Sequence, residues 1–213
     1  RDTSVTGVQT CALPIYCLYN NKYYKYNLNH RLAKNDIGLY HAIIISILTQ
    51  LFLFTDDYRL QHDIYYVSQS YFLFDAYKIA RNMKYSITNI VLILHHLIAV
   101  YSLQWIFYNT WCYGIIYIIS LTELSNIPGY YSYYFKKTKK TINQKHITNA
   151  MILSQTLIYS FIRVILLPHS LTYYNIYIYP KQFMILGTLL YIMGFVWSLK
   201  LCKQSIIIIK SYL

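Results

Sequence analysis

Long apolar runs alternate with short polar, mostly basic segments along most of this chain. The longest apolar stretch runs from Tyr85 to Phe135 and contains Glu123 as its only charged residue. At about 1.5 Å of rise per residue, a single helix of this length would exceed the ~30 Å hydrocarbon core of a bilayer more than twofold. The pattern therefore predicts two membrane-spanning helices, at about 87–107 and 111–131, joined as a tight hairpin.

Four further apolar runs are predicted to span a membrane, at 37–54, 64–79, 146–167 and 182–199. The first follows Asn35 and Asp36, residue types that cap helices. The second is the weakest, because an Asp such as Asp75 at the centre of a span costs about 3 kcal/mol on insertion scales. We expect Pro128 to kink or end the fourth helix and Pro168 to end the fifth. The predicted fold is an all-α, multi-pass membrane protein with six transmembrane helices.

The charge pattern supports this topology. The 213 residues are 56% hydrophobic and 12% charged, with a net charge of +12. The basic residues lie between the apolar runs, which is typical of membrane topology, so we do not expect nucleic-acid binding. With a cytosolic amino terminus, the cytosolic segments would hold fifteen basic residues and the opposite loops two. This asymmetry predicts that both termini, the loop around Met83 and the KKTKK segment at 136–140 are cytosolic.

The two ends of the chain differ from its centre. Residues 1–15, RDTSVTGVQTCALPI, begin without Met and resemble the translated read-through of a sequencing adapter, so we interpret them as a non-native segment. A cytosolic juxtamembrane segment is expected at 16–36, the membrane domain at 37–205 and a cytosolic tail at 206–213. The four cysteines form no CxxC pair, so the sequence indicates neither a metal site nor a disulfide framework.

Ionisable side chains inside the predicted spans are the candidates for function, because they are costly at membrane depth. His95 and His96 on the third helix and Glu123 on the fourth lie about eight residues, or ~12 Å, from the predicted cytosolic ends. Adjacent histidines diverge by about 100°, so they cannot chelate one metal as an i, i+4 pair would. One imidazole could act as a base while the other bonds Glu123 or Asp75. The candidate catalytic residues are therefore His95, His96, Glu123 and Asp75.

Two alternatives use the same side chains. A purely structural hydrogen-bonded network between the second, third and fourth helices explains them nearly as well as catalysis does. Asp75 could also pair with Lys78, one helical turn further along. Of the remaining ionisable groups, His41 is predicted about 6 Å from the cytosolic face, and Arg163 near the opposite end of the fifth helix.

Five segments together resemble the TLC domain family, which is shared by translocation-associated membrane proteins, ceramide synthases and an endoplasmic reticulum protein linked to lipofuscinosis. They are NDIGLYHA with His41, YFLFDAYKI with Asp75, HHLIAVYSL with His95 and His96, LTELSNIP with Glu123, and FIRVILLP with Arg163. The resemblance covers roughly residues 30–205. It implies a six-helix barrel around a lipid-accepting cavity, with the histidine pair inside and His41 and Arg163 as further polar lining.

The sequence departs from the ceramide synthase pattern. Those enzymes carry a histidine- and aspartate-rich motif after the paired histidines, whereas this chain has ISLTELSNIP, and Pro128 lies one position later than in the usual E-L-S-x-P. The resemblance is therefore greater to the small TLC-domain-containing branch, which is linked to membrane phospholipid composition. We expect a protein of the endoplasmic reticulum or another endomembrane that binds a membrane lipid in a cytosol-facing cavity and needs no cofactor. The alternative is a ceramide-synthase-like acyltransferase that uses His95 or His96 as acid and base and acyl-CoA as donor.

Overall fold

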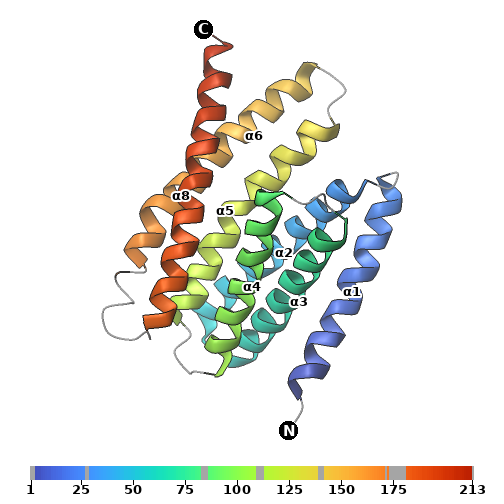
Figure 1. Ribbon diagram of the computed structural model, residues 1–213, viewed down its shortest axis with the longest axis vertical. Helices are drawn as coiled ribbons and strands as arrows, with labels where there is room; N and C mark the ends of the chain where they lie inside the picture. Colours follow the sequence, from blue (N-terminus) through green and yellow to red (C-terminus); the bar gives the residue numbers. More distant parts are fainter. Residues whose placement is uncertain are drawn as a thin grey trace. The chain divides into compact units, whose positions relative to one another are not determined.

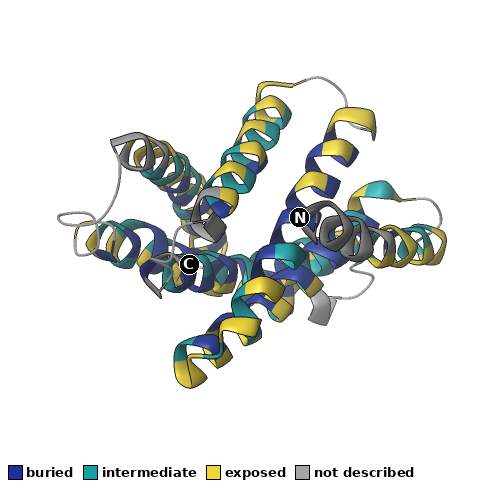
Figure 2. Cartoon of the chain, turned by 90° about the horizontal axis from the view of Figure 1, so that it is seen from below, coloured by how far each residue is buried: buried dark blue, intermediate teal, exposed yellow. Residues whose placement is uncertain are grey.

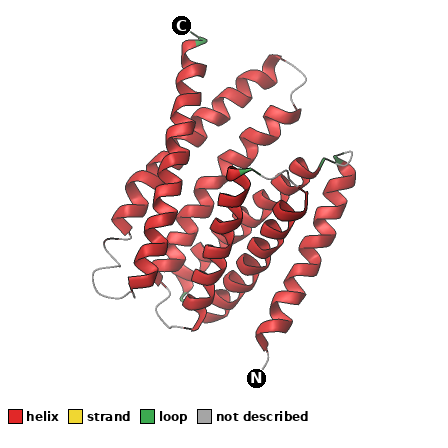
Figure 3. Ribbon diagram, viewed as in Figure 1, coloured by secondary structure: helices red, strands yellow, loops and turns green. Residues whose placement is uncertain are grey.

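The computed structural model describes residues 3–26, 29–82, 86–108, 113–138, 142–170, 172 and 181–212. In chain order the helices are α1 (Thr3–Lys25), α2 (His30–Thr55), α3 (Tyr58–Asn82), α4 (Ile87–Tyr108), α5 (Tyr113–Thr138), α6 (Ile142–Ser160), η1 (Phe161–Leu166) and α8 (Lys181–Lys210) (Figure 1). These described ranges contain helices and no strands (Figure 3), which confirms the all-α class. The chain divides into two compact units, Arg1–Tyr117 and Ile118–Leu213. The predicted hairpin is split between them, since most of α5 belongs to the second unit.

Four helices are long and apolar enough to cross a membrane. Within the described residues these candidate spans are His30–Thr55, Ile87–Gln104, Lys145–Ser170 and Gly187–Lys210. They correspond to the predicted first, third, fifth and sixth spans. The predicted second and fourth spans form helices α3 and α5, but neither is apolar enough to belong to this group. The chain is thus a helical protein with four membrane-compatible helices.

The position of α3 explains its polarity. It packs against α1, α2 and α4 within the first unit, and Figure 1 shows it between α1 and α4. Ser68, Ser70 and Tyr71 on α3 are buried by these neighbours. A helix enclosed by other helices needs no lipid-compatible surface. By contrast, α2 exposes Ile44, Ile47 and Leu51 at three- and four-residue spacing, and Figure 2 shows buried and exposed residues along the described helices.

The start of the first predicted span was misplaced. Helix α2 begins at His30, seven residues early, because Asn29 caps it: the Asn29 side chain accepts hydrogen bonds from the backbone N–H groups of Arg31 and Leu32 at 3.1 and 3.2 Å. The predicted cap at Asn35 and Asp36 is therefore wrong, since both residues lie buried inside the helix.

The buried carboxylate of Asp36 is stabilised by two side chains, one from α1 and one from the residue that follows α1. Tyr26 donates its hydroxyl to Asp36 Oδ2 at 2.5 Å, and Lys22 Nζ lies 3.2 Å from the same oxygen. Lys22 also donates to the Tyr40 hydroxyl at 3.0 Å, a bond that raises the pKa of Lys22 and keeps it charged. Most of the predicted juxtamembrane segment is thus ordered helix.

Three other predicted boundaries change. The polar connection after the first span shrinks to two residues, because Asp56 adopts a left-handed conformation with φ of 57° and closes α2 through a 2.8 Å bond to Phe52 O. Helix α5 continues through Pro128 to Thr138, so the predicted stop is wrong. Helix α8 runs to Lys210, so most of the predicted tail at 206–213 is helical.

Pro168 does not end the fifth span either. A π-helical segment, η1, follows α6 directly, and helical structure continues to Ser170. The backbone N–H of Leu167 bonds Ile162 O, five residues back. Pro168 has no N–H, and its ring would clash with the carbonyl four residues earlier in a regular α-helix. We infer that the wider π turn absorbs the proline without stopping the helix.

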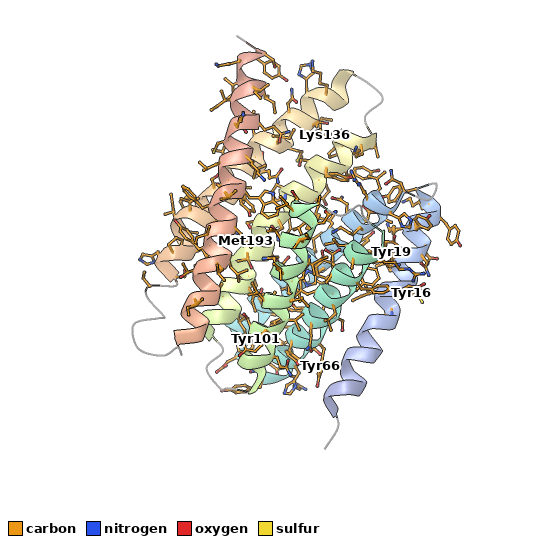
Figure 4. The ribbon with its side chains drawn as sticks, viewed as in Figure 1. Tyr16, Tyr19, Tyr66, Tyr101, Lys136 and Met193 are labelled. Atoms are coloured by element: carbon orange, nitrogen blue, oxygen red, sulfur yellow. The ribbon has the colours of Figure 1, made fainter. Side chains whose placement is uncertain are left out.

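Helix α1 packs on α3 through an aromatic contact. The Lys78 ammonium lies 4.0 Å from the centre of the Tyr19 ring and 4.9 Å from that of Tyr16 (Figure 4). Burial raises the pKa of Tyr19 to about 12, so this phenol stays neutral. The aromatic contact of Lys78 differs from the predicted pairing with Asp75.

Removing residues 1–15 should leave the melting temperature of the purified protein unchanged. The side chains of residues 1–13 lie outside the described residues, but Pro14 lies within α1 and has no N–H to bond the preceding turn, which couples the two halves of the helix weakly. The described anchoring contacts of α1 begin at Tyr16. A fall of more than ~3 °C, equivalent to about 1 kcal/mol for a chain of this size, would show that the segment is native protein.

Candidate functional site

A buried ion cluster joins three helices of the first unit. Asp75 on α3 is 2% exposed, and its Oδ2 atom lies 2.9 Å from Lys34 Nζ on α2 and 2.8 Å from His96 Nε2 on α4. His96 is 7% exposed. Two side chains that carry or can carry positive charge therefore share one oxygen of one carboxylate. We call Lys34, Asp75 and His96 the Asp75 cluster.

The structure brings two predicted site residues together in this cluster, His96 and Asp75, and adds Lys34, which the sequence analysis missed. Lys34 and His41 are seven residues apart, so they lie on one face of α2 two turns apart. The sequence indicates a shared face only if the helix starts before residue 34. Because the predicted helix started after Asn35 and Asp36, Lys34 was placed outside it.

Aromatic rings from α3 line the cluster and connect it to His41. The His41 ring stacks on Tyr71 with centroids 3.9 Å apart, and Phe72 stacks on His96 at 5.4 Å. Phe72 also meets His41 edge-on at 5.3 Å. His41 therefore lies in an aromatic layer beside the Asp75 cluster. This layer fixes the His96 ring and shields the ion pairs from solvent.

The hydrogen bonding of His96 sets its tautomer. Because the Asp75 carboxylate is an acceptor, His96 Nε2 carries the proton, and in the neutral ring Nδ1 is then an acceptor. Both His96 Nδ1 and Asp75 Oδ1 are buried and have no hydrogen-bond partner among the described residues. The cluster thus holds two buried acceptor atoms that a polar group of a ligand could bond.

His95 points elsewhere. Its ring centre lies 5.4 Å from that of His96, with the planes tilted by 60°, and His95 is only partly buried. One histidine was expected to face the bundle lumen, level with Glu123, and the other a neighbouring helix. The lumen position stays a prediction. His96 is the one that bonds the neighbouring helix.

Glu123 and Arg163 belong to the second unit. Arg163, in η1, is 6% exposed and donates from Nε to Ser125 Oγ at 3.2 Å and from Nη2 to Thr122 O at 3.1 Å, both on α5. Glu123 is buried on the same stretch of α5. The predicted set of His95 or His96 with Glu123 combines residues of both units and stays a prediction.

Helix α8 closes over Arg163. A Cβ built on Gly194 would lie 3.5 Å from both Cβ and Cδ of Arg163, an ordinary van der Waals distance, so α8 passes beside the aliphatic part of the arginine. Arg163 also lies with its guanidinium 5.2 Å from the centre of the Tyr159 ring. Arg163 therefore joins η1 to α5 and α8 within the second unit.

No protein-family model, curated protein or solved structure matches this chain. What the site can do must therefore be argued from its own chemistry.

The helix contacts of the second unit resemble those between membrane helices, because hydroxyl pairs lie among the buried apolar side chains. Thr156 Oγ1 on α6 lies 2.7 Å from Ser205 Oγ on α8. About one helical turn further along α6, Ser160 Oγ accepts a hydrogen bond from Ser198 on α8. Small polar residues let helices approach closely and hydrogen-bond across their interface in lipid. These hydroxyl pairs favour a membrane environment for the second unit.

Proposed function

We propose that this chain is an integral membrane protein of the TLC type that binds a membrane lipid and takes part in membrane lipid homeostasis. It would reside in the endoplasmic reticulum or another endomembrane, with α3 and α5 completing a six-span arrangement. The support consists of the family-like segments around His41, Asp75 and His96 and the four membrane-compatible helices. The expected ligand site is the region around the Asp75 cluster.

Asp75 Oδ2 contacts both Lys34 and His96, and this observation supports a binding role rather than a catalytic one. A carboxylate that assists a histidine base does so by stabilising the imidazolium that forms. Here Lys34, 2.9 Å away, already neutralises Asp75. Buried charges that pair in this way lock helices together, so Asp75 serves as a structural link between α2, α3 and α4. The remaining acceptor atoms can still hydrogen-bond a lipid headgroup.

The second candidate function is a ceramide-synthase-like acyltransferase with acyl-CoA as donor. It is favoured by the fixed tautomer of His96, which leaves Nδ1 as a potential base, and by the partly exposed His95 beside it. In that case a histidine would take a proton from the attacking nucleophile.

Substitutions of the histidine pair distinguish the two functions. Glutamine keeps hydrogen-bonding capacity but cannot act as a base near neutral pH, whereas alanine removes both. For a lipid binder, His95→Gln and His96→Gln should each restore the lipid profile of cells that lack the protein, measured by lipidomics. His96→Ala should lose about 1 kcal/mol of stability with the Asp75 bond.

The acyltransferase predicts a different pattern. At least one glutamine variant should then fail to restore the profile although its protein level and melting temperature are normal, and one acyl class should change in cells without the protein. Diffuse remodelling of many classes would instead favour the binder.

Topology can be tested independently. Glycosylation sites inserted beside Lys84 or Lys139 should remain unmodified, because the fifteen-to-two charge asymmetry places these loops in the cytosol. A site inserted beside Asp57 should be glycosylated, given enough spacing from the membrane. Modification at Lys84 or Lys139 would contradict the six-span arrangement.

A further inference from the structure

One end of the second unit gathers basic side chains from three helices. Lys136 and Lys137 lie in the last turn of α5, and Lys145 and His146 lie in the first turns of α6. Lys210 ends α8. All five are exposed, and Figure 4 marks Lys136 near the end of α5. We call these five residues the basic end.

Hydrogen bonds join the ends of α6 and α8 at the basic end, and α5 ends close to the start of α6 along the chain. Tyr212, just after α8, accepts a hydrogen bond from Asn149 Nδ2 at 2.9 Å, and its hydroxyl lies 3.1 Å from His146 Nδ1. Helix α5 ends at Thr138 and α6 begins at Ile142, so their termini are adjacent along the chain. The positive charges therefore belong to one surface.

Within the second unit no acidic side chain lies at this surface. Glu123 is the only Asp or Glu in residues 118–213, and it is buried on α5 some thirteen residues before Lys136. Lysines in the last turns of α5 and α8 complement the negative ends of these helix dipoles, but Lys145, near the start of α6, has no such role. A cluster of uncompensated cations is stabilised by anions from outside the chain.

The basic end also lies at the level of lipid headgroups. Lys145 and Lys210 are the terminal residues of two candidate spans, Lys145–Ser170 and Gly187–Lys210. Tyr133, whose ring centre lies 6.0 Å from Lys137 Nζ, and Tyr212 accompany the lysines. Tyrosine and lysine together are typical of the membrane–water interface.

We propose that the basic end binds the headgroups of anionic phospholipids, so that the second unit recruits acidic lipid from the surrounding leaflet. The inference rests on the membrane location in the proposed function, but not on the lipid site around Asp75. Each lysine near an anionic leaflet contributes attraction worth about a fivefold change in affinity.

Native mass spectrometry of the full-length protein, released from detergent micelles with equal amounts of phosphatidylglycerol and phosphatidylcholine, tests the proposal. The protein should retain phosphatidylglycerol preferentially. In the Lys137→Gln, Lys145→Gln double variant this preference should fall by about 25-fold, which is about fivefold for each lysine. Arg59→Gln with Lys181→Gln removes the same charge at other helix ends and should leave the preference unchanged.

Equal retention of both lipids by the unmodified protein would overturn the proposal, as would an equal loss in the control variant, since bulk charge would then explain the binding. Displacement of phosphatidylglycerol by millimolar free glycerol phosphate would also overturn it, because the site would then be one for soluble phosphate. His96→Gln should keep the phosphatidylglycerol preference whatever its effect on the cellular lipid profile, so failure of the two proposals can be told apart.

Discussion

Asp75→Ala is expected to destabilise the first unit by about 3 kcal/mol, the largest loss of any single substitution considered. Removing one partner of a buried ion pair leaves the other charge uncompensated, and such changes cost about 3–5 kcal/mol. The Lys34 side chain is 22% exposed, so its ammonium can move partly toward solvent when Asp75 is removed. The expected loss of stability therefore lies at the lower limit of this range. Equilibrium unfolding in mixed detergent micelles measures the difference.

Two companion variants make this result specific. Asp57→Ala removes an ion pair with Arg59, whose side chain is 90% exposed, and a hydrogen bond from the Arg59 backbone N–H at the start of α3, so it should cost only about 1 kcal/mol. Lys34→Met combined with Asp75→Leu replaces both charges with apolar groups and should recover most of the stability lost by Asp75→Ala. Equal stability of Asp75→Ala and Asp57→Ala would show that the Asp75 cluster does not hold α2, α3 and α4 together.

Arg163→Ala should destabilise the second unit by about 2 kcal/mol. It removes two charged hydrogen bonds, to Ser125 Oγ and to Thr122 O, and bonds of this kind contribute roughly 1.5–3 kcal/mol each. Part of the loss is offset because Ser125 Oγ and Thr122 O remain hydrogen-bonded to each other. Arg163→Lys should be only partly better, since an ammonium cannot reproduce the geometry of the guanidinium fork.

Cys202 provides a local measurement for this effect. Its thiol lies 3.9 Å from Ser160 Oγ between α6 and α8. In a protein whose other cysteines are replaced by serine, maleimide should label Cys202 faster when Arg163 is changed to Ala. Arg81→Ala is the matched control, because Arg81 is exposed and its hydrogen bond to Tyr77 is on the surface. An unchanged rate of Cys202 labelling in both variants would show that Arg163 does not stabilise the packing of α6 against α8.

Hydropathy predicted a helix within each of the six apolar runs but missed α1, and charge was not sufficient to predict which faces the helices bury. Helix α4 begins at Ile87, as predicted, because a long unbroken apolar run is typical of a membrane-spanning helix. Helix α3 could not be assigned to lipid or protein from its sequence, since its polar residues are acceptable only when other helices enclose it. The Asp75 cluster was half predicted, because Asp75 and His96 interrupt apolar runs whereas Lys34 lies in a segment already rich in basic residues.

Prolines gave the least reliable predictions. Pro128 was expected to kink or end a helix and Pro168 to end one. Neither proline ends its helix, and a kink at Pro128 stays a prediction. Tertiary packing can offset a missing backbone hydrogen bond, and a local change of helix type can remove the steric clash.

The π turn at η1 has a consequence for how this protein can vary in length. A π turn holds about one residue more than an α turn, so it rotates everything beyond it by about 100° relative to a continuous α-helix. Loss of one residue from 161–166, together with replacement of Pro168, would convert the turn to regular helix while leaving α6 itself in register with Ser198 and Ser205 on α8. Related chains should therefore gain or lose single residues here more readily than elsewhere in this span, and the position of Arg163 relative to α5 would change each time.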